Sequence, residues 1–399
     1  LEARAGKPIK IIAVSALSKS KDRGVDLTAY EWEDDPISLA KRDDIDVFVE
    51  LIGGESGQAK KATEEAIKHG KHVVTANKAM LAIHGQELAS AAENSGVNLR
   101  FEAAVAGGIP VIKTLTESLA GNNITRIMGV MNGTCNYILT RMEDTGLAYE
   151  EIFEEANQLG FLEADPNLDV GGIDAAHKLV LLSSIAYGTQ VDFNGAILEG
   201  IGRITIEDIK AASEMGYRIK LLGVSSLSDS GLSQTMRPCL VPLTSPLAQL
   251  NGGTNMIIIE GDAVGQIVLR GAGAGEGPTA SAVIADILDI ARGINIPVFG
   301  QPANSLIKVP AISTSVENSF YLRLNLKDEA GILAKVSAAL ANVGISIDRI
   351  RQEGHEKDAA PVIIVTHPTD RDTLNKAISE IEETSAAIDP PVVLRIESV

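Results

Sequence analysis

Residues 160–178 combine side chains suited to proton transfer beside a charged substrate. The segment holds four carboxylates and one lysine in nineteen residues, interrupted by Pro166 and by Gly171-Gly172. The proline prevents a helix from running through the segment, and the glycines allow sharp turns before a new helix begins. Asp174 and Lys178 are four residues apart, so on that helix they share a face and can pair.

This pattern predicts a lysine–carboxylate site. A lysine held charged by carboxylates can give a proton to a carbonyl oxygen as hydride reaches the adjacent carbon. The remaining carboxylates could hold a substrate ammonium group. The alternative is a solvated acidic loop with an ordinary surface ion pair. The glycine-rich turns and the adjacent apolar run of residues 179–182 favour the site.

Composition and charge narrow the classes of protein that need to be considered. The chain has 399 residues, 45% of them hydrophobic, which is enough for two or three domains. Its formal charge of −18 argues against nucleic acid or an anionic membrane as a partner. Cys135 and Cys239 are the only cysteines, which excludes a disulfide framework and favours a cytoplasmic location. The six histidines lack ligand spacing, and we expect no zinc site.

The first 109 residues alternate apolar strand-like runs with helical segments. The predicted strands cover residues 10–17, 45–52, 72–76 and 98–105, and the predicted helices cover residues 56–68 and 79–94. Such alternation with short links predicts a doubly wound, Rossmann-like α/β domain. Leu1 lies in what reads as the tail of a helix closed by Gly6, and we expect the sheet to lack its first strand.

Two further domains follow. Residues 110–301 predict an α+β domain with a mixed sheet and helices on one face, and residues 302–317 read as a linker. Within the first of these, a helix is expected from Pro110 to about Ala120. Residues 318–399 follow the order strand, helix, strand, strand, helix, strand, which predicts a ferredoxin-like βαββαβ plait.

Four further motifs accompany the acidic segment: Thr75-Ala-Asn-Lys78, Phe101–Pro110, Met131–Tyr137 and Gly271–Thr279. Together they resemble homoserine dehydrogenases over essentially the whole chain, in the longer bacterial form with a C-terminal ACT domain. The resemblance implies an oxidoreductase that reversibly reduces L-aspartate 4-semialdehyde to L-homoserine with NAD(P)H. That reaction belongs to threonine, methionine and isoleucine biosynthesis.

The resemblance also implies individual roles. Lys178 matches the proposed proton donor. Asp174 and Glu163 match residues that bind substrate, Asp169 matches a residue that supports the site, and Lys78 lies where cofactor and substrate meet. A cation at a helix start is unfavourable unless an anion lies beside it, which argues against Lys78 as a plain surface residue.

The cofactor evidence is uneven. Gly53 and Gly54 end a strand, where the backbone can approach a dinucleotide closely. The resemblance places Gly160 and Gly275 near the nicotinamide. The phosphate-binding Gly-x-Gly-x-x-Gly motif is absent, as expected if the first strand is missing. We therefore expect the chain as written to bind NADPH weakly or to aggregate, because the absent strand would sit mid-sheet.

The basic run of residues 18–23 favours the 2′-phosphate of NADP, although Asp22 within it leaves NAD possible.

The stretch from Phe101 to Pro110 carries a second implied feature. In the family, the residues matching Glu102, Val105, Gly107 and Ile109 bind a monovalent cation, usually sodium. The glycines would let the chain curl so that carbonyl groups converge on a hard cation. Without the resemblance, the stretch reads as a plain strand-to-helix turn. We expect the ion to be structural.

The C-terminal plait suggests regulation. Asp328, Gly331 and Ile332 lie at its first strand–helix turn and resemble the amino-acid-binding turn of ACT domains. The resemblance implies threonine as the ligand, and the alternative is an oligomerisation module without a ligand. A homodimer or a homotetramer is expected.

Two other functions stay open: another nicotinamide-dependent amino-acid dehydrogenase, or a non-catalytic amino-acid-binding regulator.

Overall fold

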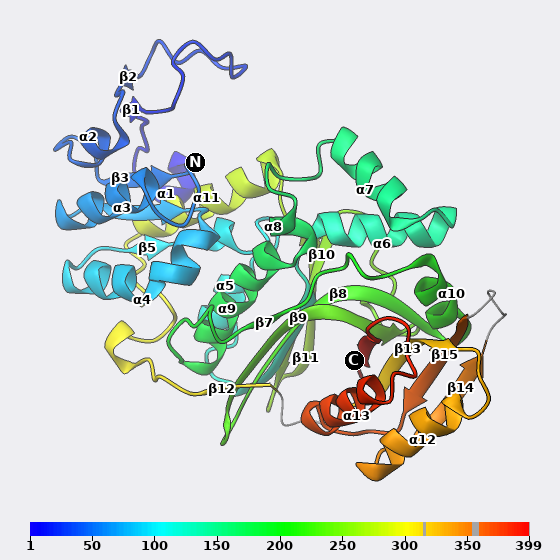
Figure 1. Cartoon of the computed structure of the whole chain (residues 1–399). Coiled ribbons are helices and arrows are strands. Elements are labelled where there is room, and N and C mark those ends of the chain that lie inside the picture. The colour runs from blue at the N-terminus through cyan, green and yellow to red at the C-terminus, as the bar shows by residue number, and fades with distance from the viewer. Residues whose placement is uncertain (314–316, 353–358, 399) are drawn as a thin grey trace.

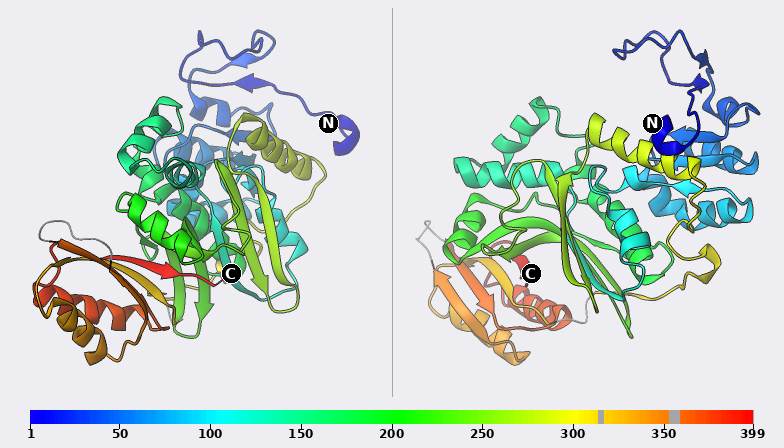
Figure 2. Two further views of the ribbon diagram at one scale, coloured as in Figure 1. Left: turned by 90° about the vertical axis from the view of Figure 1, so that its right-hand side faces the viewer. Right: turned by 180° about the vertical axis from the view of Figure 1, so that it is seen from behind.

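The computed structural model describes residues 1–313, 317–352 and 359–398. An N-terminal α/β part, a central part built on a large sheet and a C-terminal plait follow one another along the chain (Figure 1). Both views in Figure 2 place the plait and the N-terminal part at opposite ends of the central part. No helix among the described residues is long and apolar enough to cross a membrane.

The N-terminal part contains two separate parallel sheets, where one continuous sheet was expected. β1 pairs with β2, and β3, β4 and β5 pair in that order. The strands are β1 (Ala13–Val14), β2 (Glu31–Trp32), β3 (Val47–Glu50), β4 (His72–Thr75) and β5 (Leu99–Arg100). The helices are α1 (Glu2–Ala5), α2 (Pro36–Ala40), α3 (Gln58–Lys68) and α4 (Lys78–Asn94).

The strands predicted for residues 10–17, 45–52 and 98–105 are too long. Leu17, Leu51 and Ile52 lie outside the observed strands and are exposed by half or more. The predicted βα order of β3, α3, β4, α4 and β5 is confirmed.

The central sheet runs in the order β11-β10-β6-β8-β9 and is antiparallel throughout this stretch. Its strands are β6 (Ile124–Val130), β8 (Tyr217–Ser228), β9 (Gly231–Pro242), β10 (Thr254–Gly261) and β11 (Gly265–Ala272). The short β7 (Ile197–Leu198) and β12 (Ala311–Ile312) pair in parallel with β9, so the expected linker contributes a strand.

One face of this sheet packs against helices. Leu179 and Leu182 on α9 share a core cluster with Leu221 on β8 and Met236 on β9. The helices of this part are α6 (Gly133–Thr145), α7 (Tyr149–Gln158), α8 (Asn167–Val170), α9 (Ile173–Tyr187), α10 (Ile206–Glu214) and α11 (Glu276–Ala291). The expected mixed sheet with helices on one face is confirmed.

Two local expectations need correction. The helix expected from Pro110 to Ala120 is a short α5 (Val111–Lys113) that widens into a π-helix (Thr114–Ser118). α10 was missed, although Thr205 and Asp208 form the reciprocal capping box that marks its start.

The C-terminal plait has the predicted βαββαβ order. Its elements are β13 (Phe320–Lys327), α12 (Ile332–Asn342), β14 (Ile347–Gln352), β15 (Ala359–Thr366), α13 (Arg371–Glu383) and β16 (Val392–Ile396). β16 also pairs in parallel with β9, so the plait and the central part share one eleven-stranded sheet.

Candidate active site

α9 presents the predicted lysine–carboxylate pair. Gly172 precedes the helix with φ 81°, and a Cβ there would lie 3.1 Å from the Met236 side chain, so both the conformation and the space favour glycine. As predicted, no helix runs through Asp165-Pro166; the short α8 begins only after the proline.

Asp174 lies between two lysines. Its Oδ2 accepts a hydrogen bond from Lys178 Nζ at 2.7 Å, which confirms the predicted pairing along α9. Its Oδ1 lies 2.6 Å from Nζ of Lys78, the first residue of α4. Lys178 Nζ also donates to the Met131 carbonyl at 2.7 Å. An ammonium group has three N–H donors, so one remains for a substrate oxygen.

The charged neighbours of Asp174 and Lys78 shift the pKa values of both side chains. Burial alone would raise the pKa of Asp174, but the adjacent Lys178 and Lys78 bring it well below its usual range. Burial alone would lower the pKa of Lys78, but Asp174, with Glu163 and Asp169, raises it. Both shifts favour the ionised forms of Asp174 and Lys78.

Asp169 organises the loop that precedes α9. It is buried, and its carboxylate accepts hydrogen bonds from Asn132 Nδ2 at 2.9 Å and from the Glu163 amide at 3.0 Å. Glu163 is exposed as a residue, but partial desolvation of its carboxyl group, together with the charge of Asp174, raises its pKa. Asp169 thus holds the Glu163 backbone in place.

Asn132 and the Met131 carbonyl lie in the Met131–Tyr137 motif, but no role was predicted for either of them. Asn132 caps α6, and its Oδ1 accepts the Cys135 amide at 2.7 Å. An asparagine just before a helical stretch is a recognised capping signal that could have identified this residue. The carbonyl of Met131 carries no side-chain signal, so only the fold reveals it.

A pocket of about 510 Å³ opens at the end of β3 and β4. Gly53 and Gly275, both predicted to bind cofactor, line it together with Asn77, the neighbour of Lys78. Asn77 caps α4 and donates from Nδ2 to the Gly54 carbonyl at 2.8 Å. The lining of the pocket is mainly apolar, which suits the flat face of a nicotinamide ring. Gly160 lies apart from this lining, just past α7 with φ 74°.

Comparison with known proteins identifies the family. Residues 110–288 match the family described as homoserine dehydrogenase, residues 1–102 match its NAD binding domain, and residues 320–385 match the ACT domain. The chain is 42% identical to the homoserine dehydrogenase of Neisseria gonorrhoeae over 99% of its own length and 92% of that protein. The chain belongs to the homoserine dehydrogenase family.

Solved structures of this family agree with the fold. A homoserine dehydrogenase from Thiobacillus denitrificans, 40% identical, matches with a TM-score of 0.93 over 99% of this chain and 92% of the other. A hyperthermophilic archaeal homoserine dehydrogenase in complex with NADPH, 28% identical, matches with a TM-score of 0.58 over 67% of this chain and 77% of the other. The predicted family, ACT domain and oxidoreductase class are confirmed.

The predicted cation turn begins at a short 3-10 helix, Glu102–Ala104. Beyond it, Ala106 has φ 48°, in the left-handed region. The Glu102 carboxylate accepts the amides of Ile112 and Lys113 at 3.0 and 2.9 Å. The Glu102 carboxylate keeps further acceptor sites beyond these two amides, and the Ile109 carbonyl likewise accepts the Val111 amide at 2.7 Å. These contacts do not separate the four predicted cation ligands, which are Glu102, Val105, Gly107 and Ile109.

The basic loop after β1 folds onto one aromatic ring. Lys19 Nζ and the Arg23 guanidinium lie 5.7 and 5.9 Å from the centre of the Trp32 ring on β2. Arg23 also donates to the carbonyls of Ser18 and Lys21, so its position is defined. The loop thereby presents two cations at one place beside the carboxyl end of β1.

In the ACT domain, the predicted regulatory residues occupy the turn between β13 and α12. Asp328 and Gly331 are exposed there, and Gly331 has φ 88° directly before the helix. Ile332 is buried in the plait core, so its side chain anchors the turn to that core.

Proposed function

We propose that this chain catalyses the reversible, NAD(P)H-dependent interconversion of L-aspartate 4-semialdehyde and L-homoserine. The observation that carries the proposal is Asp174 held between Lys178 and Lys78, next to a pocket lined by Gly53 and Gly275. Its curated relatives carry the same enzyme name over nearly the whole chain.

In this proposal Lys178 protonates the aldehyde oxygen through its one uncommitted N–H. The bound nicotinamide supplies the hydride to the aldehyde carbon. In the reverse direction, Lys178 accepts the hydroxyl proton. Asp174 and the Met131 carbonyl fix the ammonium in one orientation, so its approach to the oxygen costs little reorganisation.

Glu163 and Asp174 divide the binding of the substrate ammonium group. The exposed Glu163 carboxylate is free to form that ion pair directly. Asp174 already engages two lysines, so it contributes charge to the ammonium without a free oxygen of its own. Asp169 holds the Glu163 backbone and is a positioning residue.

A substrate panel tests this function. At NADP⁺ concentrations high enough to offset the weak cofactor binding expected of this chain, it should oxidise L-homoserine and leave L-serine, L-threonine and L-glutamate essentially unreacted. Faster oxidation of another amino acid would indicate a different dehydrogenase. Binding of L-homoserine without turnover would indicate a regulator.

We further propose NADP as the preferred cofactor, supported by Lys19 and Arg23 beside β1 and by the archaeal relative described with NADPH. Arg23→Ala should raise the KM for NADPH about tenfold, as expected from one lost charge-assisted contact, and leave the KM for NADH unchanged. The exposed Lys335→Ala serves as the control. Equal effects on both cofactors would argue against a phosphate contact.

A monovalent cation, sodium in our proposal, is held by the Glu102 carboxylate together with the carbonyls of Val105, Gly107 and Ile109. Oxygen ligands suit a hard cation. Exchange of NaCl for tetramethylammonium chloride at equal ionic strength should lower the melting temperature. No difference between the two salts would argue against the site.

We propose threonine as a ligand of the ACT turn, supported by the exposed Asp328 and Gly331. Calorimetric titration with L-threonine, repeated on Asp328→Ala, tests this idea, and a titration without heat would contradict it.

We also propose that the chain forms a homodimer or a homotetramer in the cytoplasm. Both cysteines are free and buried, as a reducing compartment allows.

A further inference from the structure

The seam between the ACT plait and the central sheet brings arginines together. β16 pairs with β9 so that Arg395 lies opposite Cys239, and β13 pairs with β16 so that Phe320 lies opposite Arg395. Arg237 precedes Cys239 by two residues on β9. Because side chains two apart on a strand share a face, Arg237 and Arg395 lie on the same face of the shared sheet.

A third arginine lies over this face from the plait. Arg371 is the first residue of α13, and its guanidinium lies 5.8 Å from the centre of the Phe320 ring. Arg237 and Arg395 are only 8% and 5% exposed, whereas Arg371 is partly exposed. Two of these three residues, which we call the seam arginines, are therefore buried, and the third is partly exposed.

The seam arginines have donors without acceptors. Arg237 Nε, Arg371 Nη1 and Arg395 Nε are buried and have no hydrogen-bond partner within the described residues. An unsatisfied buried donor of a charged group costs more than a neutral one, and native proteins rarely leave several together. Three such donors at one seam indicate that something else accepts them.

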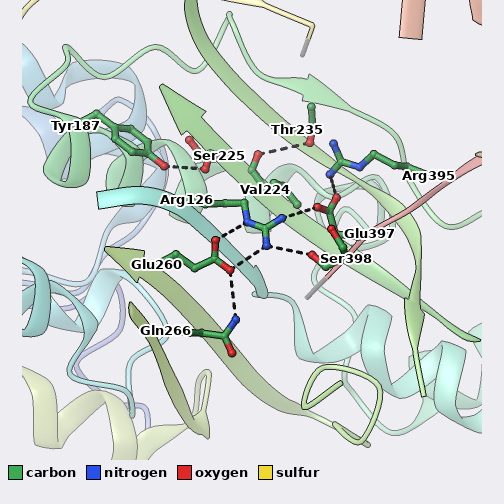
Figure 3. Close-up of polar contacts among 10 residues, drawn as sticks. All are labelled: Arg126, Tyr187, Val224, Ser225, Thr235, Glu260, Gln266, Arg395, Glu397 and Ser398. Carbon is green, nitrogen blue, oxygen red and sulfur yellow. Dashed lines mark hydrogen bonds and ion pairs between the residues drawn. The ribbon is translucent and has the colours of Figure 1, made fainter. Parts of the chain in front are cut away.

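The nearby carboxylates do not balance the charge. Glu397 is shared: its Oε1 lies 3.0 Å from Arg126 and its Oε2 lies 2.6 Å from Arg395 Nη2, in an ion pair not aligned as a hydrogen bond (Figure 3). Arg126 in turn also binds Glu260. Arg237 and Arg371 form no ion pair with a carboxylate of the described residues.

Glu199, at the end of β7, is the other carboxylate near the seam. Its amide donates to the Met236 carbonyl, which places it beside Arg237. Burial is the main cause that lowers the pKa of Arg237 and of Arg371, and the mutual repulsion of the arginines adds to it while Glu199 only partly offsets it. The seam therefore carries excess positive charge.

We propose that the seam arginines bind a small oxyanion, a carboxylate or a phosphate, at the junction of the ACT domain and the central sheet. Planar guanidinium groups bind such oxygens in pairs, and Arg371 provides an approach from solvent. The anion links α13 and β16 of the ACT domain to β9, so its binding stabilises the docked arrangement of the two parts. It lies far along the chain from residues 160–178, and its binding does not require turnover.

Isothermal titration of the full chain with sodium phosphate and, separately, with sodium succinate tests the proposal at constant ionic strength set with NaCl. Wild type should show saturable binding of one of these probes. The probe that binds more tightly identifies the preferred oxyanion. Arg237→Gln and the partly exposed Arg371→Gln should each weaken this binding about tenfold or more, the loss expected for a charge-assisted hydrogen bond.

Arg270→Gln, which changes an exposed arginine on β11, is the matched control and should bind like wild type. Two variants are used because Arg371→Gln should fold even if the more buried Arg237→Gln does not. Absence of saturable binding of both probes, or binding that Arg371→Gln leaves unchanged, would overturn the proposal.

Discussion

Two clusters of buried charge in this molecule differ in how they are balanced. Around Asp174, two lysines share the two oxygens of one carboxylate. At the seam, Arg237 and Arg371 have no ion pair among the described residues, and Arg395 shares Glu397 with Arg126. The charges of the first cluster are paired within the protein, whereas those of the second are only partly paired.

This difference follows from what each cluster has to do. A catalytic lysine works best when its charge and orientation are set before the substrate arrives, so its partners are built in. A binding site for an anion needs donors that nothing else satisfies, and it accepts the cost of burying them until the ligand is present.

The largest effect should come from breaking the first cluster. Lys178→Ala removes the proposed proton donor and should lower kcat for homoserine oxidation by about two to four orders of magnitude. The exposed Lys335→Ala on α12 should leave kcat unchanged. Steady-state kinetics measures both, and a loss below tenfold would remove Lys178 from this role.

The next largest effect should come from Glu397, the carboxylate that Arg126 and Arg395 share. Glu397→Gln leaves Arg126 and Arg395 with less compensation and should cost about 3 kcal/mol of unfolding free energy, as for other broken buried ion pairs. The exposed Glu317→Gln is the control. Denaturant unfolding reports the difference, and a Glu397→Gln midpoint equal to that of the control would show that the seam charges are not coupled.

Acid should weaken the first cluster. The pKa of Asp174 is lowered in the folded state, so its contribution is present above the ordinary aspartate pKa and is lost as pH falls below it. Between about pH 4 and pH 2, wild type should lose about 2 kcal/mol more than Asp174→Asn, on the usual scale for such pairs. Parallel stability curves for the two proteins would contradict this.

The smallest effect is expected for Arg371→Gln, which tests whether the seam arginines are unpaired. In chloride buffer, Arg371→Gln should leave stability unchanged or raise it by up to about 1 kcal/mol, because it removes an unpaired charge that its neighbours repel. In the buffer of the tighter-binding oxyanion the same change should be destabilising. Melting temperatures in the two buffers measure the reversal, and a loss of stability in both would mean that the arginines are already satisfied.

The two clusters were not equally predictable from the sequence. Asp174 and Lys178 are four residues apart on one helix, so their pairing follows from helix geometry alone. The contact of Lys78 with Asp174 joins α4 to α9, so it could be recognised only once the fold was known. The seam arginines lie on β9, β16 and α13, and no local spacing links them.

The fold shows the same division. The βαββαβ plait was predictable because each element has its own hydrophobic period. The strand lengths near β1 and β3 were overestimated because an apolar run predicts a buried strand only where neighbouring strands cover it. The pairing of β16 with β9, which creates the seam, could not be predicted from the sequence of either strand alone.

β6 has a consequence for how the two clusters relate. Arg126 on this strand binds Glu397 at the ACT end, and Met131, directly after the strand, holds Lys178 through its carbonyl. β6 is paired on both sides by β8 and β10, and an extended strand does not stretch. One continuous, hydrogen-bonded strand therefore separates the ion pair at the ACT domain from the carbonyl that holds Lys178, so the distance between these two contacts is fixed.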